Sequence, residues 1–245
     1  MQRDIGADEF SKLSKEGQKR YVVNLLIRNS EAKPVEDGQH PVAIIMAGIP
    51  GAGKTEFLQS YMEKLSQDES YGNLKFVDID LDQIVSLYPE YTPKTDKLFR
   101  SQGNLVVARC VDALRKGRYN MLIDGTFSGK SGASITNVGR LLDAGYAVLL
   151  VFMYDRAEVA WQYTQSREVE TERGIDKAGF LESCSNVFIN IREAVKRFKK
   201  NEWFDITIVK QKELRIREYD IIDEDKDIDT FLKQGYNIEE LERML

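Results

Sequence analysis

The segment from residue 48 to residue 55 has residue types and a spacing that suit phosphate chemistry. It fits the pattern G-x-x-x-x-G-K-[ST], with the residues Gly48, Ile49, Pro50, Gly51, Ala52, Gly53, Lys54 and Thr55. Glycines let successive backbone N–H groups point inward at an anion. Lys54 adds a positive charge, and the Thr55 hydroxyl can ligate Mg²⁺. The segment is therefore predicted to be a phosphate-binding loop for ATP and Mg²⁺.

Three aspartates, Asp78, Asp80 and Asp82, lie at or just after the end of the second expected strand. Ligands of open α/β sheets bind beyond the carboxyl ends of the strands, so these carboxylates should lie near the phosphate-binding loop. A carboxylate there can accept the proton of a substrate hydroxyl that attacks the γ-phosphate. The alternative is that Asp80 or Asp82 only caps a helix over Gln83–Leu87. We favour a role in the site, with Asp80 and Asp82 touching the substrate.

The third expected strand ends in Asp124, Gly125 and Thr126. Asp124 stands at the same edge of the sheet, where it could hold the water shell of magnesium or orient the substrate. Asp-Gly is also an everyday turn pair, which is the alternative explanation. The position at a strand end favours the site, and we count Asp124 among the metal and substrate ligands.

Two arginines could supply the positive charge that phosphoryl transfer needs over the γ-phosphate. Arg167 lies on the helix expected after the fourth strand, and Arg173 lies where Gly174 should end that helix. This placement suits a lid over the nucleotide. The alternative is a solvated helix face on which glutamates alternate with the arginines. Spacing alone does not separate the two.

The elements that must position these residues alternate between strand and helix. The pattern predicts a doubly wound, mostly parallel α/β sheet with helices on both faces, the fold class of P-loop NTPases. Strands are expected at Val42–Ala47, Leu74–Ile79, Tyr119–Ile123, Tyr146–Phe152, Phe204–Val209 and Leu214–Arg217. Helices are expected at Asp8–Arg28, after Gly53 to about Leu65, and at Lys94–Lys116, Ile135–Ala144, Glu158–Glu172, Lys177–Lys199, Asp227–Lys233 and Ile238–Met244.

Length and composition limit the classes of function. The 245 residues suit one domain, which we divide into an N-terminal helix and connector (1–40), a kinase core (42–210) and C-terminal elements (211–245). The lone histidine, His40, makes Ser-His-Asp hydrolysis and histidine-rich metal sites poor candidates. The net charge of −5 argues against a broad nucleic-acid-binding surface. The apolar runs are too short to span a bilayer, and no signal-peptide stretch is found, so we expect a cytoplasmic protein without a membrane partner.

In their order along the chain, these residues resemble the zeta toxin family of P-loop kinases, which also includes chloramphenicol phosphotransferase-like enzymes. The family's motif I-D-x-D, followed by a proline and an aromatic residue, is matched by Ile79-Asp80-Leu81-Asp82 with Pro89 and Tyr91. Its strand ending in acid-Gly-Thr is matched by Asp124-Gly125-Thr126. The likeness spans roughly Val42–Val209.

The resemblance implies roles for individual residues. Asp82 would be the general base, and Thr126 would touch the substrate. The groups that stabilise the transferring phosphoryl group would be Lys54, Arg167 and Arg173. It also implies a toxin that transfers the γ-phosphate of ATP to a hydroxyl of a UDP-amino sugar or another nucleotide-like metabolite, and that an antitoxin protein holds in check.

The chain departs from the family at the acceptor side of the site. Members that act on UDP-N-acetylglucosamine have an arginine where this chain has Ser128, and a glutamate where a gap-free alignment gives Ala108. We place Ser128 with the substrate-binding residues. A polynucleotide kinase, with a basic strip from Arg109 to Lys130, and a nucleotide-dependent switch without an acceptor remain the alternative functions.

Overall fold

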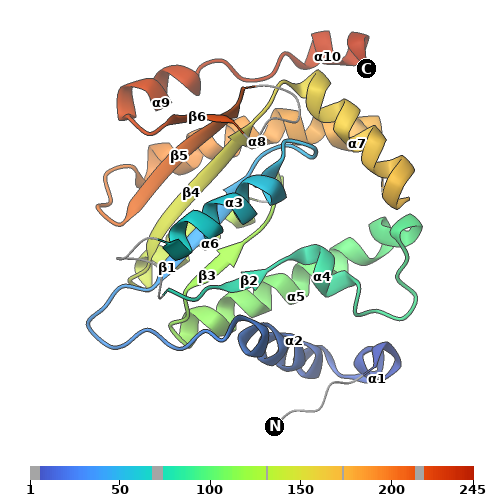
Figure 1. The fold of residues 1–245 in the computed structure, drawn as a ribbon, viewed down its shortest axis with the longest axis vertical. Helices are drawn as coiled ribbons and strands as arrows, with labels where there is room; N and C mark the ends of the chain where they lie inside the picture. The colour runs from blue at the N-terminus through green and yellow to red at the C-terminus, as the bar shows by residue number, and fades with distance from the viewer. Residues whose placement is uncertain (1–5, 68–73, 131, 173, 213–217) are drawn as a thin grey trace.

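A six-stranded sheet forms the centre of the molecule, with the strand order β2-β3-β1-β4-β5-β6 (Figure 1). The computed structural model describes residues 6–67, 74–130, 132–172, 174–212 and 218–245. Neighbouring strands from β2 to β5 are parallel, and β6 runs antiparallel to β5. The strands are β1 Val42–Ala47, β2 Val77–Ile79, β3 Met121–Ile123, β4 Ala147–Tyr154, β5 Phe204–Gln211 and β6 Tyr219–Ile222.

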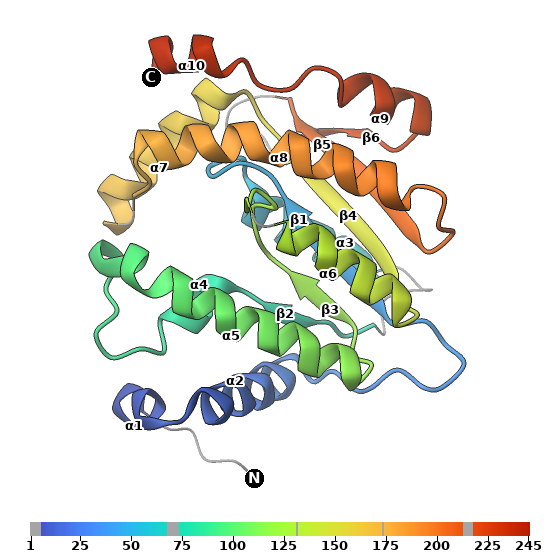
Figure 2. The same ribbon diagram turned by 180° about the vertical axis from the view of Figure 1, so that it is seen from behind.

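Helices lie on both faces of this sheet. Figure 1 shows α3 over one face, and Figure 2 shows α5, α6 and α8 over the other. The predicted α/β class of P-loop NTPases, with a doubly wound and mostly parallel sheet, is thus confirmed. The helices are α1 Ala7–Lys12, α2 Lys15–Ser30, α3 Lys54–Gln67, α4 Leu81–Val85, α5 Asp96–Lys116, α6 Ala133–Asp143, α7 Ala157–Thr171, α8 Lys177–Phe198, α9 Asp225–Phe231 and α10 Ile238–Met244, and the 3₁₀ helix η1 is Pro93–Thr95.

The central strand β1 carries the phosphate-binding loop at its carboxyl end. Its residues from Ala43 to Ala47 are buried, as expected for a parallel strand covered by helices on both faces. The register pairs Ile45 with Ile123 of β3, and Ile123 with Ile79 of β2. The carboxyl ends of β1, β2 and β3 therefore meet at one edge of the sheet, which is where ligands bind in this class of fold.

Several expected boundaries were wrong for local reasons. The helix expected over Asp8–Arg28 is divided into α1 and α2, because Ser14 accepts a hydrogen bond from Gly17 N and starts a new helix. The helix expected from Lys94 begins as η1, which Thr92 caps, and α5 starts only at Asp96. The strand expected at Leu214–Arg217 lies outside the described residues, and the last strand that the structure describes is β6 at Tyr219–Ile222.

His40 fixes the loop before β1 through two contacts with other parts of the chain. Its ring stacks on Trp203 with ring centroids 3.7 Å apart, and its Nδ1 lies 2.8 Å from the carbonyl oxygen of Gly145. His40 is therefore a loop residue that packs against Trp203 and Gly145. Among the helices of the described residues, none combines the length and the apolar character that crossing a membrane requires.

Candidate active site

The loop that follows β1 is packed closely against the end of β4 and the start of α7. Gly48 and Gly51 adopt φ angles of 147° and 80°, which favour glycine. A Cβ atom on Gly48 would lie 2.5 Å from the carbonyl oxygen of Met153, and one on Gly51 would lie 2.2 Å from that of Ala160. Both glycines are therefore required by the available space as well as by the backbone.

Lys54, the first residue of α3, turns its side chain back over this loop. Its Nζ donates to the carbonyl oxygens of Gly48 and Ile49, at 3.1 and 3.0 Å. Burial lowers the pKa of Lys54 to about 8, and the negative charge of Asp124 opposes this shift. A phosphate group in the loop would supply further negative charge beside this ammonium, so the geometry suits an anion.

The loop after β3 is tied to the phosphate-binding loop and to β2. Gly48 N donates to the carbonyl oxygen of Thr126 at 3.1 Å, and Asp124 N donates to that of Ile79 at 3.2 Å. Asn190 of α8 donates to the carbonyl oxygens of Phe127 and Gly129, at 2.8 and 3.1 Å. The backbone that carries the predicted substrate residues is thus fixed from three sides.

The side chains on this loop form a neutral polar group. Thr126 Oγ1 lies 2.7 Å from Ser128 Oγ, and the Ser128 hydroxyl lies 3.4 Å from Ser183 Oγ of α8. Asn186, one turn further along α8, has a buried Nδ2 without a hydrogen-bond partner. Ser183, Asn186 and Asn190 recur at helical spacing, so one face of α8 looks onto this loop.

Two half-buried carboxylates, Asp78 of β2 and Asp124 after β3, lie at the strand ends. Each has one Oδ1 atom that is buried without a hydrogen-bond partner. Burial, together with the negative charges of Asp80 and Asp124, raises the pKa of Asp78 to about 6. Burial also raises the pKa of Asp124, against the opposing effect of Lys54. Such carboxylates are suited to a cation that would replace the missing partners.

Asp80 accounts for the start of α4. Its Oδ1 accepts a hydrogen bond from Asp82 N at 2.8 Å, so Asp80 is the cap of a helix that begins at Leu81, two residues before the expected Gln83–Leu87. Asp80 is therefore a helix cap, and its contact with substrate stays a prediction. Because of this cap, Asp82 lies in the first turn of α4, where its side chain is aimed away from the helix.

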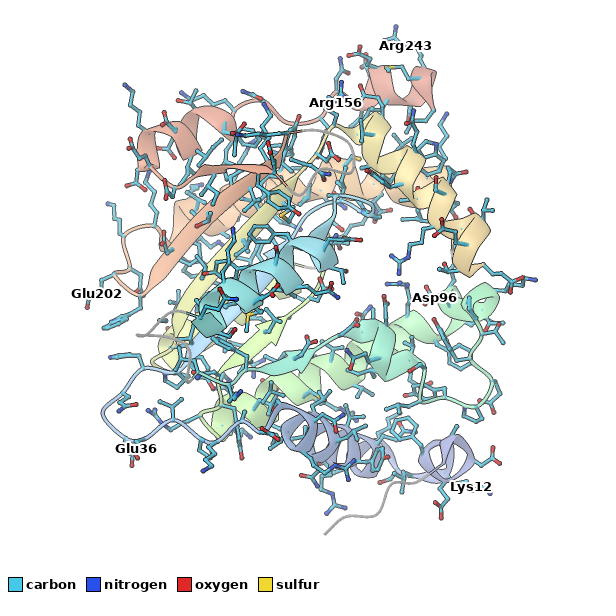
Figure 3. The ribbon with its side chains drawn as sticks, in the orientation of Figure 1. Lys12, Glu36, Asp96, Arg156, Glu202 and Arg243 are labelled. Atoms are coloured by element: carbon cyan, nitrogen blue, oxygen red, sulfur yellow. The ribbon has the colours of Figure 1, made fainter. Side chains whose placement is uncertain are left out.

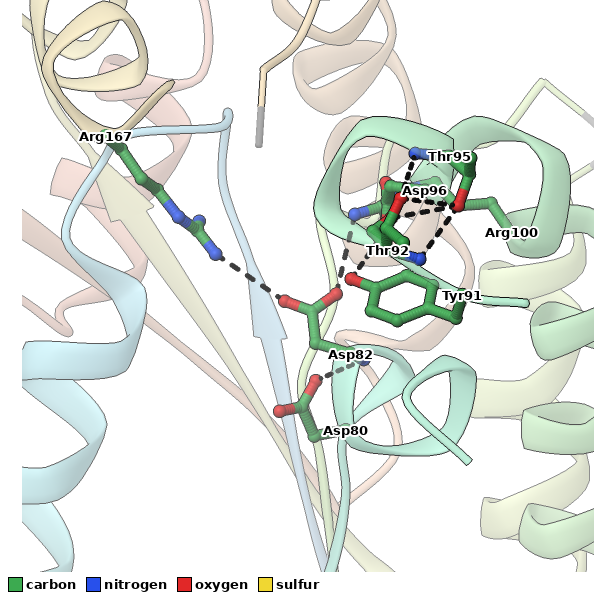
Figure 4. Close-up of polar contacts among 8 residues, drawn as sticks. All are labelled: Asp80, Asp82, Tyr91, Thr92, Thr95, Asp96, Arg100 and Arg167. Atoms are coloured by element: carbon green, nitrogen blue, oxygen red, sulfur yellow. Dashed lines mark hydrogen bonds and ion pairs between the residues drawn. The ribbon is translucent and has the colours of Figure 1, made fainter. Parts of the chain in front are cut away.

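The Asp82 carboxylate lies between two arginines (Figure 4). Its Oδ2 is 3.7 Å from an Nη2 atom of Arg167 on α7, and its Oδ1 is 3.4 Å from Nη2 of Arg100 on α5. Figure 3 shows side chains of α7 and of the region around Asp96 pointing toward one another at this place. The charges of Arg167, Asp82 and Asp124 all act on Lys54, so these groups share one site.

A magnesium ion would need few protein ligands at this site. The described residues contain no group of three histidine, cysteine or acidic side chains that could hold a metal ion by itself. Mg²⁺ in nucleotide sites is typically held by one or two protein oxygens together with phosphates and water. The Thr55 hydroxyl at the start of α3 and the orphaned Asp124 oxygen fit this requirement.

Most of the residues predicted from the sequence come together here. The phosphate-binding loop, Asp82, Asp124, Thr126 and Arg167 lie at the carboxyl edge of the sheet. Arg173 lies outside the described residues. Sequence reasoning missed Arg100 and the polar face of α8. The spacing of Asp96 and Arg100, four residues apart in an expected helix, was a signal for an ion pair that could have drawn attention to Arg100.

Comparison with known proteins points to one family. A family model described as zeta toxin matches residues 28–225. No curated protein matches the sequence. Among solved structures, a protein of the PezAT chromosomal toxin-antitoxin system of Streptococcus pneumoniae is 20% identical, with a TM-score of 0.61 over 98% of this chain and 94% of that one.

Two further similar structures come from complexes of AvrRxo1-ORF1 with AvrRxo1-ORF2. One native complex contains a chain that is 14% identical, with a TM-score of 0.63 over 94% of this chain and 78% of that one. A second, described as a complex with ATP, is 14% identical, with a TM-score of 0.57 over 94% and 82%. At these identities the likeness concerns the fold.

Proposed function

Because this chain belongs to the zeta toxin family and is a phosphotransferase, we propose that it transfers the γ-phosphate of ATP to a hydroxyl of a small nucleotide-like metabolite, such as a UDP-amino sugar. The observation that carries the proposal is the Asp82 carboxylate, which pairs with Arg167 at the edge where the phosphate-binding loop leaves β1. A base and a phosphate-binding cation at one site are what a kinase requires.

The proposed reaction assigns a task to each group. The loop amides and Lys54 hold the β- and γ-phosphates, with Lys54 exchanging its present carbonyl partners for phosphate oxygens. The acceptor hydroxyl oxygen forms a bond to the γ-phosphorus, the bond to the bridging oxygen of ADP breaks, and Asp82 takes the hydroxyl proton. Arg167 balances the charge that gathers on the transferring group.

Magnesium would be held by Thr55 and Asp124. When bound, Mg²⁺ neutralises phosphate charge and orients the γ-phosphate. The support for Asp124 as a ligand is its buried oxygen without a partner and its electrostatic contact with Lys54. A bound nucleotide with its cation would relieve the mutual repulsion of Asp124 and Asp78.

The neutral group formed by Thr126, Ser128 and Ser183 supports an acceptor that presents hydroxyl or amide groups there. Hydroxyls can donate or accept, so they suit the ring of a sugar or a nucleoside. The buried Asn186 Nδ2 offers another donor on the same side. A diphosphate at this position would require a cation, and Ser128 does not supply one.

An antitoxin protein is proposed as the macromolecular partner. The support is family membership and the similar fold of a protein from a toxin-antitoxin system. Co-expression with the product of an adjacent gene tests this point. Recovery of a complex in which the kinase is inactive supports the partner. If the two proteins elute separately and the kinase is active, the proposed partner is contradicted.

The polynucleotide-kinase alternative depends on the basic strip from Arg109 to Lys130. Several side chains of this strip form ion pairs or hydrogen bonds within the protein. Arg115 pairs with Asp112 at 3.8 Å, and Lys130 pairs with Glu182 at 2.9 Å. Arg118 donates to three backbone carbonyls between residues 35 and 39. These cations are largely occupied within the protein, so we do not propose nucleic acid as the acceptor.

The proposed function is tested by incubating the protein with Mg-ATP and a small-molecule extract of cells. Mass spectrometry should then find a metabolite that has gained one phosphate. In a parallel reaction, the protein is incubated with labelled Mg-ATP and 5′-hydroxyl oligonucleotides. Transfer to oligonucleotides alone would replace the proposal with the polynucleotide kinase, and ATP hydrolysis without any phosphorylated product would favour a nucleotide-dependent switch.

A further inference from the structure

Arg100 joins two carboxylates that come from different elements. Its Nε donates to Oδ2 of Asp96 at 2.5 Å, and its Nη2 lies 3.4 Å from Oδ1 of Asp82 (Figure 4). Asp96 and Arg100 are four residues apart on α5, so the helix itself brings their side chains together. The planar guanidinium presents donors to both acids in a fixed geometry, which a lysine ammonium on its flexible stem does not provide.

Asp96 is an anchor because its side chain is only 7% exposed. A buried carboxylate is costly unless it is paired and hydrogen-bonded. Arg100 supplies the charge, and the Tyr91 hydroxyl lies 3.4 Å from the other carboxylate oxygen. This arrangement fixes the guanidinium at its Nε side and leaves the Nη2 side directed at Asp82.

The second arginine of the site is held differently. Arg167 approaches the other oxygen of Asp82, and its side chain is 56% exposed, compared with 41% for Arg100. Arg100 therefore contacts Oδ1 while the buried Asp96 holds its Nε, whereas Arg167 contacts Oδ2 from α7 with a more exposed side chain. The two oxygens of one carboxylate are thus held by one anchored cation and one that is better placed to exchange its partner.

We propose that Arg100 is a positioning residue for Asp82. Asp96 holds Arg100, and Arg100 in turn fixes the Asp82 carboxylate through Oδ1. The Oδ2 atom is thereby directed toward the acceptor hydroxyl. That hydroxyl occupies the position of Arg167 once the arginine has moved to the phosphates. This inference rests on the proposed function, since it assumes that Asp82 accepts the hydroxyl proton. It assigns to Arg100 an effect on the chemical step and none on nucleotide binding.

The experiment compares variants in transfer from labelled Mg-ATP to the small-molecule extract. Arg100→Met should lower kcat roughly tenfold to hundredfold, because a misdirected base loses its near-attack geometry, while KM for ATP is unchanged. Arg100→Lys should recover little of this loss, since it keeps the charge without the fork. Arg140→Met is the matched control, because Arg140 also pairs with an α5 acid, Asp112, and should retain wild-type kcat.

A second pair of variants separates positioning from folding. Arg100→Met combined with Asp96→Asn leaves no buried unpaired charge, so this double variant should fold, as thermal unfolding will report, and should show the same loss of kcat. In an Asp82→Asn background, Arg100→Met should cause no additional loss.

The role of Arg100 is overturned if Arg100→Met leaves kcat unchanged. It is also overturned if Arg100→Met lowers kcat in the Asp82→Asn background by the same factor as in the wild type. A matching rise in KM for ATP would make Arg100 a nucleotide ligand instead. If Asp82→Asn retains wild-type transfer, or the wild type phosphorylates nothing in the extract, the proposed function fails first.

Discussion

Arg167 of α7 and Asp82 of α4 face one another, with a guanidinium nitrogen 3.7 Å from the carboxylate. Two exposed ion pairs lie between neighbouring elements: Lys94 of η1 pairs with Glu172 at the end of α7 at 2.9 Å, and Lys97 of α5 pairs with Asp176 before α8 at 2.5 Å. The end of α7 and the start of α8 are thus linked to η1 and to the start of α5, the helix that packs beside α4 and its Asp82. Nucleotide binding and acceptor activation would then both depend on the ion pair between Arg167 and Asp82. A phosphate group could replace Asp82 as the partner of Arg167, and an acceptor hydroxyl could replace Arg167 as the partner of Asp82.

Replacement of Arg167 should affect both catalysis and nucleotide binding. Arg167→Met is expected to lower kcat roughly a hundredfold, because it removes a cation from the transferring phosphoryl group. Steady-state kinetics with varied Mg-ATP measures this, with Arg156→Met at the start of the same helix as the control. Wild-type kcat in Arg167→Met would assign the arginine to the solvated helix face.

The affinity for ATP should fall as the pH rises through about 8, the pKa of Lys54. Burial has lowered this pKa, so the free protein loses the ammonium proton in that range, and binding must then restore it. Calorimetric titration between about pH 7 and about pH 9.5 should show weakening affinity and proton uptake. In Lys54→Met, affinity should be low and independent of pH; the wild-type slope in this variant would contradict the assignment.

Gly51→Ala should destroy nucleotide binding. The added methyl group would meet the carbonyl oxygen of Ala160 at 2.2 Å, and the backbone there has a φ of 80°. Gly38→Ala is the matched control, because Gly38 has a φ of 87° but open space around it. The control should lose only about 1–2 kcal/mol of unfolding free energy and retain full ATP binding. Equal effects of the two substitutions would refute the close-packing argument.

Asp78 should make the protein less stable near neutral pH when no metal is present. The folded protein holds the Asp78 proton with a pKa of about 6, above the ordinary value of 3.8. The folded state therefore binds more protons than the unfolded chain between these values, and stability rises as the pH falls through about 6.

The substitution Asp78→Asn should accordingly raise the unfolding free energy at neutral pH, by at most about 3 kcal/mol, and flatten its pH dependence. Chemical denaturation in the presence of a chelator measures both effects, and Asp143→Asn serves as an exposed control. A less stable Asp78→Asn protein would show that the buried carboxylate has a favourable partner in the fold.

The sequence predicted the inner strands of the sheet well because they are apolar and buried. β1 was predicted with its observed bounds, and α10 likewise. The expected strand from Leu74 was too long, since only Val77–Ile79 pairs with β3. Apolar residues such as Phe76 are buried without belonging to the ladder, and a hydrophobic pattern does not distinguish these two states.

The candidate site was predicted only in part, because sequence motifs identify residues that are close in sequence and do not show contacts between elements that are distant in sequence. Spacing predicted the phosphate-binding loop and a group of three acids, and the family resemblance then singled out Asp82 among them. Arg100 could not be assigned to the site, since its contact with Asp82 depends on how α5 packs beside α4. The same holds for Ser183 and Asn190, which reach the loop after β3 from a helix far along the sequence.

The central claim is that Asp82 activates the acceptor beside the phosphate-binding loop. Single-turnover transfer of labelled γ-phosphate to the small-molecule extract, measured for wild type and Asp82→Asn with ATP affinity determined in parallel, tests it most directly. The account predicts that Asp82→Asn binds ATP as wild type does and transfers phosphate about a hundredfold more slowly or worse. Transfer at the wild-type rate by a folded, ATP-binding Asp82→Asn protein would contradict it.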